Sequence, residues 1–195
     1  MHKSKNQLYV PVDLAAVCSV AFILLLLYLS MAGFKAEEPV RVNMPETSGY
    51  RCTMNGLGDA VILLGEGKVF LRLPDTVRKD VLLQMSNKYN TRFTKSQCNR
   101  FKNIEFIGIS IAAFHQEVLP HDQSGISLQG KDNELAAWIS AASKTYRTLY
   151  QRDMQIGIKA DKDTRYTLIK DVITVLQNQN INRFSFITAT KVKHD

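Results

Sequence analysis

The segment "IGIKADKDTRYTLIKDVITVLQNQNINRFSFITA", residues 156–189, decides the fold of this chain. A short β-type run comes first, a run with apolar residues at helical spacing follows, and a second β-type run closes the segment. We predict a strand over 155–160 and a returning strand over 183–189. Between them, Asp163 or Thr164 caps a helix. Two strands joined through a helix lie parallel with a right-handed crossover, so the segment predicts an α/β fold.

A β-hairpin precedes this segment. In "DAVILLGEGKVFLRL", residues 59–73, two apolar β-type runs flank the "GEGK" stretch at 65–68. The glycines permit the positive φ angles of a tight turn. Farther upstream, "VRVNMPE" (40–46) alternates apolar and polar residues, which predicts a short strand ended by Pro45. Together these parts predict a mixed β-sheet packed by helices.

Two more helices and one more strand are expected in the same domain. "LPDTVRKDVLLQMSNKY" (73–89) predicts a helix capped by Asp75 or Thr76. "DNELAAWISAASKTYRTLY" (132–150) predicts an amphipathic helix, because its apolar residues recur at helical spacing. "IEFIGISIAAF" (104–114) reads as a strand.

The N-terminal part has a different character. "LYVPVDLAAVCSVAFILLLLYLSMAGF" (8–34) contains 21 consecutive uncharged residues, from Leu14 to Phe34. About 20 apolar residues are enough to cross a bilayer as a helix. A signal peptide is the alternative, since a positive leader precedes the run and Ser30-Met31-Ala32 has the small residues of a cleavage site. The run is longer than a usual signal core, so we prefer an uncleaved transmembrane helix over 9–34.

The flanking charges predict the orientation of this helix. Lys3 and Lys5 precede it, whereas the charges that follow it nearly cancel. The positive-inside rule therefore assigns residues 1–8 to the cytoplasm. Residues 35–195 then form one periplasmic domain in a bacterium with two membranes, and the chain is a single-pass inner-membrane protein.

The net charge is +7, with no tract of Lys and Arg dense enough to indicate nucleic-acid binding. One stretch, residues 87–102, has five basic and no acidic residues. It could approach anionic lipid or glycan, but we interpret it as a solvated face or loop. The role of the longer region 87–152 stays open.

The cysteines allow one disulfide. Cys18 lies within the apolar run and behaves as a small apolar residue. Cys52 and Cys98 both lie outside it, where oxidation is permitted. A disulfide between these two and a pair of unpaired thiols both remain possible.

No catalytic constellation stands out, which favours a protein that is not an enzyme. His115, Glu117 and His121 lie close together, but their spacing matches no metal motif and a surface loop is the better interpretation. Phosphate-binding and nucleophile motifs are missing from the sequence. We therefore predict no metal and no cofactor.

Asp13 is the candidate functional residue, because it is an acid inside an apolar run. If the helix begins near Val10, Asp13 lies in its first turn and interacts favourably with the helix dipole. The alternative is that Asp13 faces a watery or protein-lined crevice, as intramembrane acids usually do. A single helix cannot form such a crevice, so this alternative requires a partner. The residues that share the face of Asp13 are Ala16, Val17, Val20, Leu24 and Leu27.

These features resemble the ExbD/TolR family of biopolymer-transport subunits. The basic leader, a proline shortly before an intramembrane Asp and an aliphatic single span are similar to the family's N-terminus. "VRVNMPE" is similar to its first strand after the span, "VILLGEGKVFL" to its glycine-turn hairpin, and the closing segment to its C-terminus. Residues 87–152 are similar to the longer middle region of Bacteroidetes-type members. One departure is the single residue between Pro11 and Asp13, where the family usually has two.

The resemblance implies an energy-transducing motor. Its members sit as a dimer of span helices inside a ring of an ExbB-like multi-span channel subunit, and Asp13 would bind and release protons. The periplasmic domain would then pass movement to a TonB-like protein that serves import across the outer membrane. Two alternatives remain, namely a TolR-like subunit for envelope integrity and a membrane-anchored binding module without an ion role.

Overall fold

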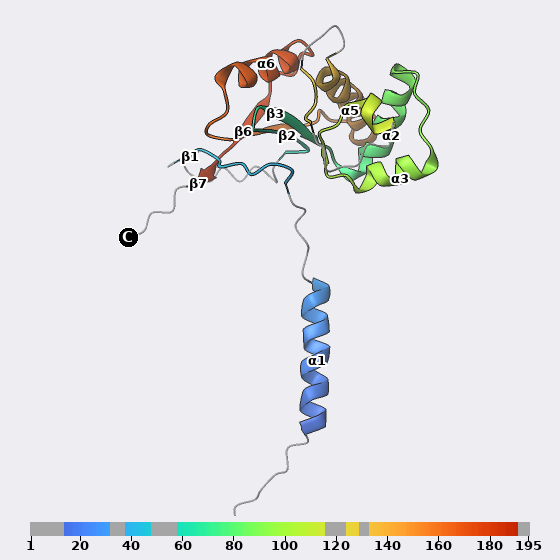
Figure 1. Cartoon of the computed structure of the whole chain (residues 1–195), viewed down its shortest axis with the longest axis vertical. Helices are drawn as coiled ribbons and strands as arrows, with labels where there is room; N and C mark the ends of the chain where they lie inside the picture. Colours follow the sequence, from blue (N-terminus) through green and yellow to red (C-terminus); the bar gives the residue numbers. More distant parts are fainter. Residues whose placement is uncertain (1–13, 32–37, 48–57, 116–123, 129–132, 191–195) are drawn as a thin grey trace, which may run out of the picture. The chain divides into compact units, whose positions relative to one another are not determined.

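The computed structural model describes residues 14–31, 38–47, 58–115, 124–128 and 133–190. These residues form two units, the single helix α1 (Leu14–Met31) and a folded domain that begins at Glu38. The N-terminal apolar helix and the mixed sheet packed by helices confirm the predicted α/β architecture (Figure 1).

The domain is built on a five-stranded sheet with the order β4-β3-β2-β5-β6. β5 pairs in parallel with β2 on one side and with β6 on the other, whereas β3 is antiparallel to both β2 and β4. The sheet is therefore mixed, as the sequence predicts. Its strands are β2 (Ala60–Gly65), β3 (Lys68–Arg72), β4 (Phe106–Ile107), β5 (Ile156–Ala160) and β6 (Phe184–Ile187).

The predicted hairpin is confirmed, with β2 and β3 paired from Val61↔Arg72 to Gly65↔Lys68. Positive φ angles fall at Glu66 (51°) and Gly67 (73°). Two successive positive φ values define a type I′ turn, whose twist matches that of the flanking strands. The turn thus places one of its two left-handed positions on a glutamate rather than on a glycine.

Residues 40–46 do not form the predicted strand. They run as an irregular segment, and only Glu46–Thr47 (β1) pairs with a strand, the parallel Ala189–Thr190 (β7). Val40 instead packs with Leu63, Phe70 and Phe106. The alternating pattern correctly indicated that one side of this segment is buried. The segment packs that side against the face of the sheet instead of joining the sheet as a strand.

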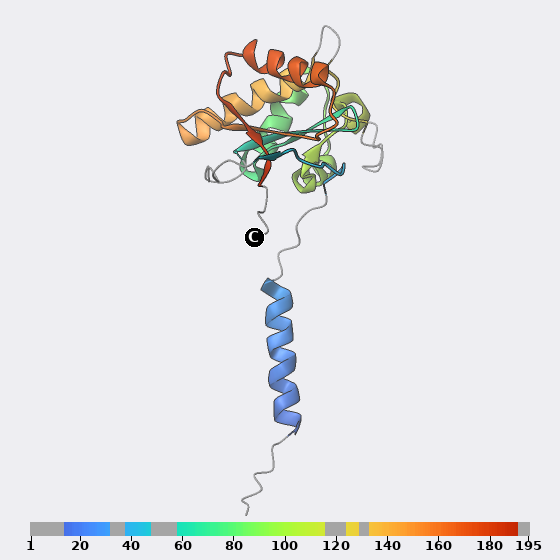
Figure 2. The same cartoon turned by 90° about the vertical axis from the view of Figure 1, so that its left-hand side faces the viewer.

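Glycine at position 65 permits this close covering. A β-carbon there would lie 2.8 Å from the Cγ1 atom of Val40, which is closer than side chains pack. Figure 2 shows the 38–47 segment on one side of the sheet and the main helices on the other. Leu63 of β2 accordingly faces the segment, whereas Ile62 and Leu64 belong to the larger core under the helices.

The helices that cover the sheet are α2 (Asp75–Lys88), α3 (Lys95–Asn103), α4 (Ile111–His115), α5 (Glu134–Tyr150) and α6 (Tyr166–Gln177). The 132–150 prediction is confirmed by α5, whose N-cap Asn133 accepts a hydrogen bond from the Ala136 N–H. The predicted caps of α2 are wrong, because Pro74 holds the N-cap position and Asp75 lies in the first turn. Proline leaves no backbone N–H unpaired at a helix start.

The region 104–114 combines a strand and a helix. Only Phe106–Ile107 is a strand, and α4 follows from Ile111. Residues 95–103, within the stretch expected as a solvated face or loop, form α3. A capping box starts α3, because the Thr94 side chain accepts from the Gln97 N–H and the Gln97 side chain accepts from the Thr94 N–H.

The closing β5-α6-β6 unit is confirmed, with parallel pairing from Ile156↔Phe184 to Lys159↔Ile187. The predicted caps of α6 are wrong by one or two residues, since Arg165 holds the N-cap position without a side-chain cap. Asp161 serves the preceding loop instead. Its carboxylate accepts hydrogen bonds from the Asn43 and Asp163 N–H groups, at 2.8 Å and 2.9 Å.

Candidate functional site

Helix α1 is the described helix that is long and apolar enough to cross a membrane. Its 18 residues rise about 27 Å, close to the thickness of a bilayer core. The segment carries no charged residue, and none of its side chains is buried in the structure. The hydroxyl of Ser19 donates to the Ala15 carbonyl at 2.8 Å, so this polar group is satisfied within the helix. The helix is suited to lipid and to contact with other spans.

Asp13, the predicted proton-binding residue, lies outside the described residues and directly precedes Leu14, the first residue of α1. The face predicted to continue from it is present in α1. Val17, Val20, Leu24 and Leu27 lie along one side at helical spacing, and each is more than half exposed. An apolar surface of this kind is available to another span, and the role of Asp13 stays a prediction.

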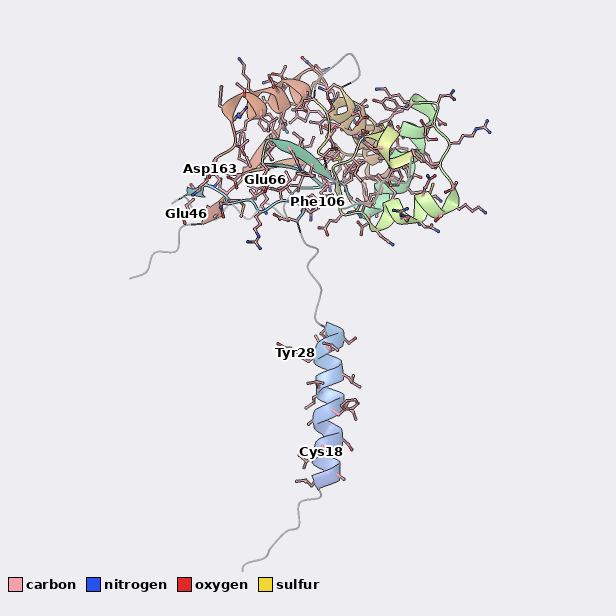
Figure 3. All side chains as sticks on the ribbon, in the orientation of Figure 1. Cys18, Tyr28, Glu46, Glu66, Phe106 and Asp163 are labelled. Atoms are coloured by element: carbon pink, nitrogen blue, oxygen red, sulfur yellow. The ribbon has the colours of Figure 1, made fainter. Side chains whose placement is uncertain are left out.

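Tyr28 is a residue that the sequence analysis did not use. It is 82% exposed and lies near the C-terminal end of α1, with Cys18 toward the other end (Figure 3). Tyrosine is enriched at membrane interfaces, because its ring is apolar and its hydroxyl remains in water. Its position three residues before the helix end was the signal that could have identified it.

A cleft of about 670 Å³ opens beside the hairpin turn and the start of α6. Glu66, Asp161 and Asp163 line it together with Arg41 and Arg165, and Figure 3 labels two of the acids. Hydrogen bonds from the Asp163 and Asn43 N–H groups lower the pKa of Asp161, so that this carboxylate stays ionised at neutral pH. Asp161 therefore fixes the 38–47 segment through the Asn43 N–H. The cleft contains both acidic and basic side chains, so its charge favours no one class of ligand.

The other sequence candidates give no compact site in the described part of the chain. The side chain of His115, together with Glu117 and His121, lies outside the described residues, as does Cys52. Cys98 is a free, half-buried cysteine on α3, which favours the alternative of unpaired thiols over a Cys52–Cys98 disulfide. Among described residues, no group of three or more His, Cys, Asp or Glu could hold a metal ion.

Strand β6 forms one edge of the sheet. Phe186 on this strand is 51% exposed, and its neighbours are only half-buried. An edge strand presents backbone N–H and C=O groups that can pair with another strand. This edge is the part of the domain best suited to backbone pairing.

An apolar helix long enough to cross a membrane, followed by a mixed α/β domain, is the arrangement expected of a protein with one membrane anchor. The model of one family, the biopolymer transport protein ExbD/TolR, matches residues 5–191. The chain belongs to the ExbD/TolR family. Neither the comparison with curated proteins nor that with solved structures finds a match.

Membership identifies the chain as a subunit of a motor that energises biopolymer transport. Members generally work with ExbB- or TolQ-type and TonB- or TolA-type partners and form oligomers. The single N-terminal apolar helix is consistent with a single-pass inner-membrane protein.

Proposed function

We propose that this chain is the ExbD-type subunit of an inner-membrane motor that uses the proton motive force to energise TonB-dependent transport across the outer membrane. The observation that carries the proposal is the family match over 5–191, which includes both Asp13 and the apolar helix that follows it. Residues 1–8 are cytoplasmic and the domain is periplasmic in this proposal. The chain has no catalytic activity of its own.

Asp13 is the proton carrier. A proton that crosses the membrane releases about 2.3 kcal/mol per 100 mV of membrane potential. Asp13 would be neutral when it faces the apolar contact with a channel subunit and charged when it faces a watery path, because desolvation disfavours the ionised carboxylate. Because protonation changes the charge of Asp13, the proton gradient would change which side of the surrounding channel-subunit ring the α1 helix contacts.

The partners follow from the same assembly. An ExbB-like multi-span subunit surrounds the span, a second copy of the chain completes a dimer, and a TonB-like protein receives the movement. An acid beside an apolar span supports the need for other helices, because one helix cannot form a watery or protein-lined crevice for it.

The test is Asp13→Asn, with Asp13→Glu as the matched variant. Asn is close to Asp in shape but cannot ionise, so proton-dependent uptake of an outer-membrane substrate should be abolished at matched protein levels. Glu keeps the chemistry but displaces the carboxyl by a methylene, so partial uptake is expected. Normal import by Asp13→Asn cells would show that Asp13 is only a first-turn acid at the membrane edge.

A TolR-type role in envelope integrity is the second candidate, because the same family model covers both types. Capture experiments with the tagged chain separate the two. Recovery of a TonB-like protein supports the import role, whereas recovery of peptidoglycan without such a protein supports the TolR-type role. An anchored binding module without an ion role predicts that Asp13→Asn leaves proton-dependent work unchanged, whereas either motor role predicts its loss.

A further inference from the structure

The exposed side of α3 carries a concentration of positive charge. From residue 81 to residue 104 the chain has five Lys and Arg residues and no Asp or Glu. Gln97 and Phe101 form the buried side of α3, while Lys95, Arg100 and Lys102 are exposed. Arg92, just before the helix, is exposed as well. We call Arg92, Lys95, Arg100 and Lys102 the basic surface.

The cations of the basic surface have no acidic partner in the described part of the chain. The ion pairs found there involve Arg72, Arg78, Arg147, Arg152 and Lys159. The nearest acid after α3, Glu105, pairs with Arg72 at 3.6 Å. The positive charge is therefore available to an external anion.

The C-terminal end of α3, with Arg100 and Lys102, lies close to the point where the chain enters the domain, whereas Lys95 lies about 10 Å farther along the helix axis. The domain begins at Glu38, and Val40 packs against Phe106. Phe106 follows the last residue of α3 by three positions. In Figure 1 the 38–47 segment and α3 run along the same side of the domain.

The connection to the membrane helix is short. Six residues, 32–37, separate Met31 from Glu38, and the seven steps between these two residues extend about 25 Å at most. Electrostatic attraction extends about 8 Å at physiological salt, so a modest approach brings a basic surface under the influence of the bilayer.

We propose that the basic surface docks the domain on the anionic phospholipid headgroups of the membrane in which α1 is anchored. A Lys or Arg side chain near an anionic bilayer surface is attracted by about 1 kcal/mol, and salt screens this attraction. The capping box holds α3 as a defined helix, in which Lys95 and Lys102 lie about 20° apart around the axis and Arg100 lies about 140° from Lys95. The cations therefore flank a broad exposed side centred near Asn99. The proposal requires α1 to be a membrane anchor but does not depend on the proton role of Asp13.

Docking would give the domain two states, one held against the bilayer and one released. The release would be favoured by high salt or by a partner that competes for the same side chains. The contact is a surface one, since each cation is exposed and the described side includes Ser96, Asn99 and Asn103 rather than large apolar residues. The basic surface thus lies on the headgroups without insertion.

The experiment measures lysine acetylation of the full-length chain in nanodiscs by mass spectrometry. Lys95 and Lys102 are the reporters, and the exposed Lys144 on α5 and Lys170 on α6 are internal controls. Figure 1 shows α6 at the opposite end of the domain from α3. Discs of phosphatidylcholine alone are compared with discs that also contain phosphatidylglycerol.

We expect acetylation of Lys95 and Lys102 to slow by about five-fold in the phosphatidylglycerol discs, the factor for one basic residue at an anionic surface. High salt should remove this protection, and the control lysines should react equally in both lipids. The double variant Arg92→Gln/Arg100→Gln should reduce the protection, because it removes half of the basic surface and keeps both reporters. The matched double variant Arg165→Gln/Arg183→Gln, at exposed positions near α6 and β6, should retain it.

Equal acetylation of the reporters in both lipids would overturn the proposal. So would protection that appears in phosphatidylcholine discs only after an anionic glycan is added, since this would assign the surface to glycan. Neither result depends on transport activity, so failure here is distinguishable from failure of the proposed motor function.

Discussion

Asp59 connects the start of β2 to the chain that leads from α5 into β5. Its carboxylate accepts two hydrogen bonds from the Arg152 guanidinium, at 2.9 Å and 3.0 Å, and one from the Gln155 N–H at 2.9 Å. The guanidinium also lies over the Tyr146 ring, 4.9 Å from its centre. The Asp59 carboxylate thus links the start of β2 to the chain between α5 and β5.

These contacts give the stability of the domain a pH dependence. Burial alone would raise the pKa of Asp59, but the hydrogen bonds from Arg152 and Gln155 outweigh it and lower the pKa. A carboxyl whose folded pKa is lowered stabilises the fold above its unfolded pKa of about 3.9. This contribution is lost as the pH falls through the lowered folded value.

We therefore expect Asp59→Asn to reduce the free energy of unfolding by about 1 to 2 kcal/mol at neutral pH, the range for charged hydrogen bonds with one partner partly exposed. The difference from wild type should shrink below about pH 4. Chemical denaturation across a pH series measures it. Asp80→Asn, at an exposed carboxylate on α2, is the control and should change little. A difference that stays constant at acid pH would contradict the role of ionised Asp59.

At the scale of elements, the sequence predicted best the segments with one strong pattern. The hairpin, α5 and the β5-α6-β6 unit follow from apolar periodicity and from glycine at a turn. Segment 40–46 was predicted as a strand because alternating apolar residues indicate one buried side. Sequence does not tell whether such a segment joins the sheet as a strand or packs across its face, as Val40 does. α3 was missed because its helical pattern has only two buried positions, although "TKSQ" at 94–97 carries the capping-box signal.

The candidate site was less accessible to sequence reasoning than the fold. Asp13 could be identified because an acid in an apolar run is costly and rare. The basic stretch at 87–102 could be identified as well, but its position near the chain entry could not, because that position depends on Val40 meeting Phe106 across 66 positions of sequence. Contacts between distant segments of this kind follow from the packing of the whole sheet, not from a local pattern.

The capping box of α3 gives a prediction at the element scale. Thr94→Ala removes the acceptor for the Gln97 N–H, and we expect a loss of about 1 kcal/mol in the free energy of unfolding with faster hydrogen exchange in the first turn of α3. Chemical denaturation and hydrogen exchange by mass spectrometry measure the two effects. Ser96→Ala, an exposed hydroxyl in the same turn, should leave both unchanged. Equal effects from the two variants would show that general loss of a hydroxyl is responsible.

The open edge of β6 gives a second prediction at this scale. Because side chains of a strand alternate between the two faces, two copies paired along β6 would bring alternate positions together. Single cysteines placed along 184–190 should form crosslinks between two copies of the chain in a period-two pattern. The same scan along the exposed side of α5 serves as the control for random collision. A uniform yield along 184–190 would argue against strand pairing.

The chain combines an apolar helix whose side chains are exposed with a domain that has its own hydrophobic core. The domain buries one face of β2, β3 and β5 under helices, and the 38–47 segment covers part of the other face at Leu63 and Phe70. Helix α1 has no such cover within the described chain. The domain therefore buries its apolar side chains internally, whereas the apolar side chains of α1 require lipid or other membrane helices.

This difference leads to a prediction about assembly. An acid beside a bilayer-spanning helix is stabilised by a water path or a protein partner, neither of which one helix can form. We expect the chain expressed without an ExbB-like multi-span protein to be unstable or to show no proton flux in vesicles. Coexpression should restore flux and allow both proteins to be purified together on a tag carried by this chain. Asp13→Asn is the control that separates assembly from proton passage, because it should copurify with the partner but carry no flux. Full proton-linked activity of the chain alone would show that the span provides its own path, and the motor assembly proposed for this protein would have to be abandoned.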